Sequence, residues 1–423
     1  MQILLSLSVA LFAGLMLSRL AKRVQLPAVT AYLVAGILIG PYLLGSLGVK
    51  GLGFVSVQDI KSYGIISDVA LGFIAFSIGN EFRLSQLKQI GKKATVIGIF
   101  QAVVATVLVD AALIGLHFII PDVLPLPSAI VLGAVASATA PAATLMVVRQ
   151  YKSKGPLTDI LLPIVAIDDA VGLVLFAVSF GVAKALISGK VDVLSVIVEP
   201  VLEVVLSLGL GYIMGVIFTF FERFFHSRSK RLSMSVTFVF LTVALSMVEF
   251  KIGGVHVAFS SLLVCMMLGT VFCNLCDFSE ELMDRIARWS APLFILFFVI
   301  SGAELELATF KDAAVVIIGL VYIVARSLGK YIGAASSSKW MGCDSNIVKY
   351  LGVTLLPQAG VALGMAIKAE ALGAEGAIVT NITLFSVLIY ELVGPFFTKV
   401  ALERAGEINP HGKVSARDMA KKA

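Results

Sequence analysis

The chain has few charged residues and few of the side chains that bind metals or form disulfides. Only 14% of its 423 residues are Asp, Glu, Lys or Arg, against about 25% in average proteins. Its four cysteines are too few and too scattered for a disulfide framework. Its four histidines, His117, His226, His256 and His411, do not cluster along the chain. These shortages argue against a soluble domain, a disulfide-stapled secreted domain and a histidine metal centre.

Two short motifs are better explained by structural roles than by ligand binding. Cys273 and Cys276 form a CxxC pair, but no second pair of ligands accompanies them, so we do not expect a metal or redox site. The glycines of GLGYIMG, residues 209–215, lie within an apolar run, which favours close helix packing over nucleotide binding. We therefore expect no nucleotide-binding domain and no cofactor.

The chain does have long apolar runs. It is 59% hydrophobic and its mean hydropathy is +1.00. Thirteen apolar segments of about 18–28 residues recur along it, each long enough to cross a bilayer, at about 2–19, 28–46, 64–81, 94–118, 127–149, 158–186, 195–222, 231–249, 255–274, 287–305, 312–337, 347–369 and 376–400. We predict an all-α polytopic membrane protein whose first segment is a retained span, because no basic region precedes it.

The basic residues predict the orientation. Loops that follow the odd-numbered segments hold 24 of the 33 lysines and arginines, and the opposite side holds seven. Positive charge concentrates on the cytoplasmic side of membrane proteins, so we expect the N-terminus outside and the C-terminus inside. The net charge of +6 then needs no nucleic-acid partner. The short loops favour the bacterial inner membrane.

Two predicted spans are interrupted by proline at corresponding places. Pro141 lies in VASATAPAATLMVV and Pro357 in VTLLPQAGVALGMA. Proline removes a helical hydrogen bond, and the carbonyls it frees in a bilayer must face protein or water. The two spans lie seven apart and so cross in opposite senses. We predict an inverted repeat of segments 4–6 and 11–13 whose discontinuous helices cross at Ala140, Pro141, Leu356, Pro357 and Gln358.

Asp168 and Asp169 are adjacent within the apolar run LLPIVAIDDAVGLVLFAVSF. Each carboxylate at bilayer depth costs on the order of 2.5–3.5 kcal/mol, so two together indicate a site that holds a proton or a small cation. Consecutive helical residues point about 100° apart, so their roles should differ. Hard cations prefer oxygen ligands, and the Thr139 hydroxyl and the freed carbonyls near Ala140 and Leu356 could join the carboxylates.

Arg326 and Lys330 lie four residues apart on one face of segment 11. They could offset the negative helix ends at the crossing or pair with the aspartates. A fixed Asp168–Arg326 salt bridge with no role in transport is the purely structural interpretation. Weaker polar candidates are Asp68, Gln101, Asp110, Gln358 and Glu391, the last of these on the segment opposite the aspartate pair.

Several motifs together resemble the monovalent cation:proton antiporters, in the branch with paired aspartates. They are LPAVTAYLVAGILIGP (26–41), DVALGFIAFSIGNEF (68–82), ATAPAAT (138–144), AIDDAVGL (166–173), ARSLGKYIG (325–333) and LLPQAG (355–360). The third-span motif departs from the family at Asn80, where an apolar residue is usual. The resemblance covers about residues 26–395, nearly the whole apolar region.

The resemblance implies a homodimer in which a six-helix core, about 94–186 and 312–400, moves against dimerisation helices at about 2–81 and 195–305. Residues 401–423 would form a polar cytoplasmic tail. Asp169 would be the main ion- and proton-binding residue, and Asp168 would pair with the basic residue of segment 11. Arg326 occupies that family position, where many members carry a lysine.

We therefore expect a transporter, not an enzyme, that exchanges Na⁺ or Li⁺, or alternatively K⁺, for H⁺ across the bilayer. A Na⁺-coupled organic-solute symporter of related fold is the alternative. An intramembrane aspartyl protease would need its two aspartates on different helices, and a passive channel would show a filter-like loop. Neither feature is found in this sequence.

Overall fold

The computed structural model describes residues 2–23, 26–48, 53–56, 58, 60, 62–80, 82–188, 199–248, 250–252, 255–276, 279–304 and 313–408. All statements below concern these residues. Residues 409–423, most of the predicted tail, lie outside them, and so does His411.

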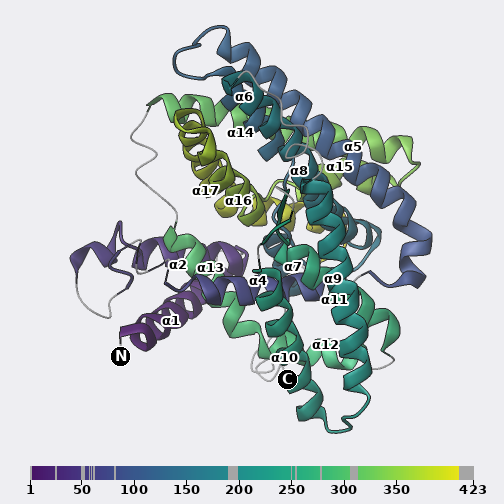
Figure 1. The fold of residues 1–423 in the computed structure, drawn as a ribbon. Helices are drawn as coiled ribbons and strands as arrows, with labels where there is room; N and C mark the ends of the chain where they lie inside the picture. The colour runs from purple at the N-terminus through teal and green to yellow at the C-terminus, as the bar shows by residue number, and fades with distance from the viewer. Residues whose placement is uncertain are drawn as a thin grey trace.

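The described chain is almost entirely helical (Figure 1). Its first half contains α1 (Gln2–Arg23), α2 (Ala28–Ile39), η1 (Leu44–Leu47), α4 (Gly64–Gly79), α5 (Leu84–His117), α6 (Leu126–Val135), α7 (Pro141–Tyr151) and α8 (Pro156–Ser188). Its second half contains α9 (Glu199–Glu222), α10 (Arg228–Ser246), α11 (Ser261–Leu275), α12 (Ser279–Trp289), α13 (Ala291–Glu304), α14 (Ala313–Trp340), α15 (Ser345–Thr354), α16 (Gly360–Ala369), η4 (Glu370–Leu372) and α17 (Ala374–Arg404). Strands β1 (Phe250–Ile252) and β2 (Val255–Val257) form a small antiparallel pair before α11.

Every predicted apolar segment contains a helix or a pair of helices, and the segment at 255–274 begins in strand β2, before α11. Seven helices of the described residues are long and apolar enough to cross a membrane, and the α12–α13 pair, bent by 50°, gives an eighth. The other predicted spans are shorter. The segments at 127–149 and 347–369 are each divided into two half-helices of 10 or 11 residues.

The helices form two groups (Figure 1). In one group α14 packs on α5, α5 and α6 pack on α8, and α16 packs on α17. In the other, α13 packs on α2, and α11 packs on α4 and α9. The half-helix α7 contacts α8 and α17 of the first group and also α2 and α4 of the second. It therefore lies where the two groups meet.

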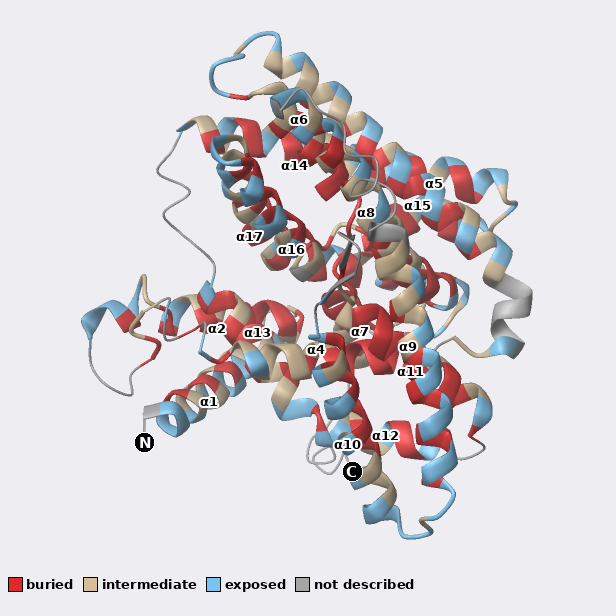
Figure 2. Cartoon of the chain, viewed as in Figure 1, coloured by how far each residue is buried: buried red, intermediate tan, exposed pale blue. Residues whose placement is uncertain are grey.

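Apolar side chains cover much of the outer surface. Exposed positions, drawn in pale blue, recur along α1 in Figure 2. Leu4 and Leu20 on α1, and Ile213 and Phe220 on α9, are more than half exposed. A surface of this kind is compatible with lipid and unfavourable in water. It is the surface expected of a multi-pass membrane protein.

The glycine run of α9 serves helix packing at two of its three glycines. A Cβ on Gly211 would lie 2.4 Å from the Val264 carbonyl oxygen, and one on Gly215 would lie 2.6 Å from the Val271 Cβ. Only glycine permits this close approach of α9 to α11. A Cβ on Gly209 would meet no neighbouring helix of the described residues within 4 Å, so Gly209 does not contribute to this packing.

Candidate ion-binding site

The two proline-interrupted spans meet at their breaks. α6 ends at Val135 and α7 begins at Pro141, and α15 ends at Thr354 and α16 begins at Gly360. The backbone N–H of Ala140 donates a hydrogen bond to the Pro357 carbonyl oxygen at 2.8 Å. This bond joins one break to the other and leaves several backbone groups of both breaks without helical partners.

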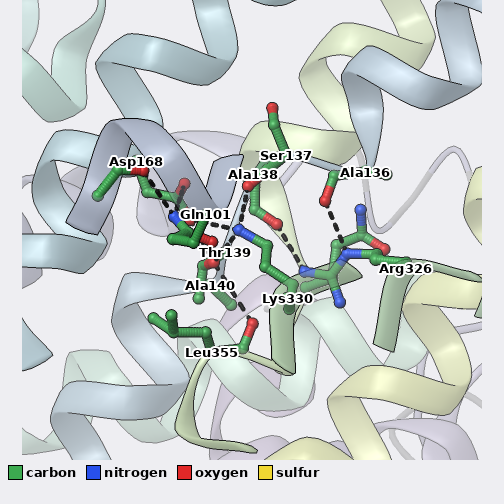
Figure 3. A network of polar contacts seen from close by, with 12 residues as sticks. Gln101, Ala136, Ser137, Ala138, Thr139, Ala140, Asp168, Arg326, Lys330 and Leu355 are labelled. Atoms are coloured by element: carbon green, nitrogen blue, oxygen red, sulfur yellow. Dashed lines mark hydrogen bonds and ion pairs between the residues drawn. The ribbon is translucent and has the colours of Figure 1, made fainter. Parts of the chain in front are cut away.

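Asp168 and Asp169 lie on α8 beside this crossing, and both are almost completely buried. Asp168 accepts hydrogen bonds at both carboxylate oxygens (Figure 3). The Gln101 amide nitrogen donates to Oδ1 at 2.5 Å, the Lys330 ammonium donates to Oδ2 at 2.7 Å, and the Thr139 hydroxyl also donates to Oδ2. Asp168 is thus a fully partnered buried carboxylate.

Lys330 connects Asp168 to the first break. Its ammonium group also donates to the Ser137 carbonyl oxygen and, at 3.0 Å, to the Thr139 hydroxyl. Lys330 and Asp168 both have fully buried side chains. A buried ion pair is stable when further hydrogen bonds satisfy both partners, and here those bonds come from the break and from α5.

Arg326 contacts backbone, not a carboxylate. Its guanidinium donates to the carbonyl oxygens of Ala136 at 3.0 Å, Ala138 at 2.7 Å and Leu356 at 2.7 Å. These carbonyls follow the C-terminal ends of half-helices α6 and α15, where the helix dipole is negative. The guanidinium also lies over the Tyr390 ring, 4.4 Å from its centroid. Arg326 therefore supplies positive charge where two negative helix ends meet.

The expected Asp168–Arg326 salt bridge is wrong, because Lys330 is the partner of Asp168. The chemistry of the two cations explains the difference. A guanidinium has five donors in a planar fork and can serve several separate carbonyls, whereas an ammonium is a compact point charge. The sequence also predicted a basic side chain at the negative helix ends, and Arg326 lies there.

Asp169 has a different environment. Neither of its carboxylate oxygens has a hydrogen-bond partner among the described residues. Asp169 lines a cavity of about 230 Å³ together with residues of both breaks, among them Ala140 and Ala359. Asp68 and Lys368 lie on the same cavity. The basic-residue distribution predicts that the end of α16 that carries Lys368 is on the outer side.

The remaining polar candidates are dispersed. Gln358 donates to the Val135 carbonyl oxygen at 3.0 Å and to the Tyr322 hydroxyl at 2.8 Å, so it satisfies the end of α6 and does not line the cavity. Asp110 lies against Gly133 of α6, and its Oδ1 has no described partner. Glu391 is buried on α17, and its Oε2 is likewise without a described partner.

Two tyrosines of the site were missed in the sequence. Tyr322 accepts from Gln358, and Tyr390 stacks on Arg326 and shares a 2.8 Å hydrogen bond with Ser327. An isolated tyrosine in an apolar helix carries no signal that separates it from ordinary core residues.

The CxxC pair lies away from this site. Cys273 donates to the Thr270 carbonyl oxygen at 3.2 Å, and Cys276 lies 3.8 Å from a Glu222 carboxylate oxygen. In the described part of the chain, no three His, Cys, Asp or Glu side chains come together as a metal site.

The family follows from comparison with known proteins. The family model described as "Sodium/hydrogen exchanger, transmembrane" matches residues 7–404. The chain belongs to the sodium/hydrogen exchanger family. This exchanger is accordingly a multi-pass membrane transporter of the cation/proton antiporter class, not an enzyme.

Relatives of this exchanger resemble it along most of their length. The Na⁺/H⁺ antiporter NhaS4 of Synechocystis sp. is 25% identical over 83% of this chain and 85% of its own. The K⁺/H⁺ antiporter subunit KhtU of Bacillus subtilis is 22% identical over 90% of this chain and 89% of its own. The structure of the sodium proton antiporter MjNhaP1 from Methanocaldococcus jannaschii at pH 8 covers 96% of this exchanger and 97% of its own chain, with a TM-score of 0.61 and 19% identity. That likeness shows a shared fold.

Proposed function

We propose that this exchanger moves Na⁺, Li⁺ or K⁺ against H⁺ by alternating access, and that cation and proton compete for Asp169. One observation carries the proposal. Two adjacent buried carboxylates have opposite surroundings: Asp168 is fully hydrogen-bonded, whereas Asp169 has no hydrogen-bond partner among the described residues and lines a cavity. A buried carboxylate without a partner is costly, and binding a proton or a cation removes that cost.

The contacts limit which groups can coordinate the cation. The Thr139 hydroxyl donates to Asp168, and the Leu356 carbonyl oxygen accepts from Arg326 at 2.7 Å. Both were expected as ligands, but neither residue lines the cavity at Asp169. The Asp169 oxygens, the backbone at Ala140, which does line the cavity, and water are the oxygen ligands that we assign to a hard monovalent cation.

The moving parts belong to the same proposal. We assign α5–α8 and α14–α17 to a core that carries the site, and α1–α4 and α9–α13 to a scaffold through which two copies form a dimer. The core and scaffold would together make thirteen spans, with the two broken spans in inverted repeats. One of the two clusters of buried apolar residues is built entirely from the proposed core and supports this division, and the other contains residues of both parts.

The choice of ion stays between Na⁺ and K⁺. One relative is named for Na⁺ and another for K⁺, and carboxylate oxygens discriminate weakly between hard cations. We place the exchanger in the bacterial inner membrane because its loops are short, and its N-terminus outside because of the distribution of its basic residues.

The geometry does not favour the organic-solute symporter. Pockets for organic ligands are commonly about 300–1,000 Å³, and the cavity at Asp169 is about 230 Å³. Its lining is mostly apolar, with two carboxylates, one lysine and two serines. Such a cavity fits a cation and its water better than a polar organic solute.

The test uses proteoliposomes with a preset acidic interior and a dye that reports the pH gradient. Na⁺, Li⁺ and K⁺ are added separately to the wild type, to Asp169→Asn and to Asp122→Asn, whose carboxylate is exposed. We expect dequenching by at least one cation in the wild type and in Asp122→Asn, and none in Asp169→Asn.

Two outcomes contradict the proposal. Exchange that persists in Asp169→Asn would remove Asp169 from the site. A wild type that shows no cation-dependent dequenching at any pH would reject the proposed exchange and favour solute-coupled transport, which labelled-solute uptake driven by Na⁺ would then detect.

A further inference from the structure

The chain turns sharply where α17 ends. Gly406 adopts φ +79°, the left-handed conformation that favours glycine. Its N–H donates to the Glu403 carbonyl oxygen, and the Glu407 N–H donates to the Leu402 carbonyl oxygen. This hydrogen-bond pair is a Schellman motif. It directs residues 405–408, here called the C-terminal strap, back toward the start of α8.

Glu407 of the C-terminal strap caps α8. One carboxylate oxygen accepts the Leu157 backbone N–H at 2.7 Å. The other accepts the Thr158 backbone N–H at 2.8 Å and the Thr158 hydroxyl at 2.6 Å. The first backbone N–H groups of a helix have no partner within the helix and carry its positive dipole end. The Glu407 carboxylate, from the far end of the chain, accepts hydrogen bonds from two of these N–H groups, those of Leu157 and Thr158.

The residues before α8 are adapted to this contact. A Cβ on Gly155 would lie 2.5 Å from the Glu407 carboxyl carbon, so only glycine leaves room for the cap. The Glu407 carbonyl oxygen accepts the Lys154 N–H at 3.2 Å and the Ser153 hydroxyl at 3.4 Å. The main chain and the side chain of Glu407 thus both hold residues 153–158.

α8 contains two prolines near its start, and the Glu407 carboxylate adds hydrogen bonds to its first turn. Pro156, its first residue, has no N–H, and Pro163 lies inside the helix, where it removes one helical hydrogen bond. The first turn is therefore joined to the rest of α8 across a weakened segment. Asp168 lies eleven residues beyond Leu157, about 16 Å along the helix axis.

The C-terminal strap also contacts α15, the half-helix that leads into the second break. The Asn346 amide donates to the Ala405 carbonyl oxygen at 3.4 Å. Ala405 and Ile408 pack against the buried apolar cluster that includes Leu402. One short segment thus joins the aspartate helix, the second broken span and α17.

We propose that Glu407 is a positioning residue for ion binding: its carboxylate holds the N-terminus of α8 and so sets the place of the aspartate pair at the broken-helix crossing. This inference rests on the proposed exchange at Asp169. Glu407 does not touch the ion. It acts through α8, and its loss should weaken cation binding in correctly folded protein.

The test combines point variants with two truncations of the full chain. Glu407→Ala removes the cap, and Glu407→Gln keeps one acceptor oxygen without the charge. Glu403→Gln, a change of the same kind one turn earlier on a side chain that is 40% exposed, is the matched control. One truncation stops after Ile408 and keeps the cap, and the other stops after Ala405 and removes it.

Two measurements are made on each protein. Hydrogen–deuterium exchange follows the Leu157 and Thr158 amides, and proteoliposome assays give the half-saturating concentrations of Na⁺ and K⁺, normalised to folded protein. We expect Glu407→Ala and the shorter truncation to raise both amide exchange and half-saturating concentration about five- to tenfold, the scale of one lost hydrogen bond. For Glu407→Gln, both quantities should lie between those of the wild type and of Glu407→Ala. The Glu403→Gln control and the longer truncation should match the wild type.

The outcomes separate the two proposals. A purely structural role would lower the amount of folded protein and leave the half-saturating concentration unchanged, and that result overturns the inference. Unchanged amide exchange in Glu407→Ala also overturns it. If the wild type exchanges no cation, the proposed function fails, and the amide measurement, which needs no transport, still decides whether Glu407 caps α8.

Discussion

Lys330 and Asp168 form an ion pair that is completely buried and hydrogen-bonded on both sides. Removing one member leaves the other as an unpaired charge, which costs about 3–5 kcal/mol. We therefore expect Lys330→Met to lower the unfolding free energy by that amount, and the double variant Asp168→Asn/Lys330→Met to recover much of it. Thermal unfolding in lipid nanodiscs measures both.

The double variant is also the control, because it separates loss of the pair from loss of the lysine side chain. Asp168→Asn alone completes the cycle, and if the destabilisations of the two single variants add up to that of the double variant, the interaction between the two charges contributes nothing. That result would contradict the ion pair as a source of stability.

The sequence predicted the members of this site better than their partners. Charged residues in apolar runs are conspicuous because each is costly in a bilayer, so Asp168, Asp169, Arg326 and Lys330 could be identified. Arg326 and Lys330 share one helix face, and the local sequence does not show which of them lies level with the breaks. Which of them meets Asp168 depends on where half-helix α6 ends, and only tertiary structure supplies that.

At the scale of elements, the proposed core and scaffold share several polar contacts among the described residues, one of which joins α7 to α2. The Gln150 side-chain oxygen accepts the Ala28 backbone N–H at 2.7 Å, in the first turn of α2. A core that moves against the scaffold must break this bond. The bond therefore favours the arrangement described here, in which the cavity at Asp169 lies toward the predicted outer side.

Gln150→Ala should shift the equilibrium away from that arrangement. Loss of about 1 kcal/mol from one hydrogen bond corresponds to roughly a fivefold change in population. We expect Ala359→Cys, which lies on the cavity, to react more slowly with an external membrane-impermeant maleimide when Gln150→Ala is also present. Cys343→Ser in the background removes the one native cysteine that is not fully buried. Labelling that does not slow would contradict the role of this bond.

Helices were more predictable than their interruptions and connections. Apolar runs of span length fold as helices because the backbone must satisfy itself in lipid, and Pro141 and Pro357 marked both breaks. The β1–β2 pair and the bend between α12 and α13 were missed. α12 carries Glu280, Glu281, Asp284, Arg285 and Arg288 and is amphipathic, so its charges suggested an ordinary loop between spans.

For the whole molecule, competition at one site makes cation affinity depend on pH. Protons that occupy Asp169 exclude the cation, so the half-saturating cation concentration should rise as pH falls, with a limit of about tenfold per pH unit for one shared proton. The maximal rate at saturating cation should change much less over the same range.

Initial rates in proteoliposomes at several pH values, each over a full range of cation concentrations, measure this dependence. A half-saturating concentration that stays constant while only the maximal rate changes would indicate separate sites for proton and cation. Asp122→Asn should show the same pH dependence as the wild type, because its side chain is exposed and distant in sequence from the breaks.

The pairing of Asp168 with Lys330 also bears on energy conversion in the cell. Under the proposed mechanism the two side chains neutralise each other throughout the cycle, and an arginine such as Arg326 keeps its proton under any accessible condition. Asp169 would then be the group that changes its occupant, one cation would replace one proton, and a full cycle would transfer no net charge. Membrane voltage, which supplies about 2.3 kcal/mol per elementary charge at 100 mV, neither drives nor opposes such a cycle. Exchange would stop when the concentration ratios of cation and proton across the membrane are equal.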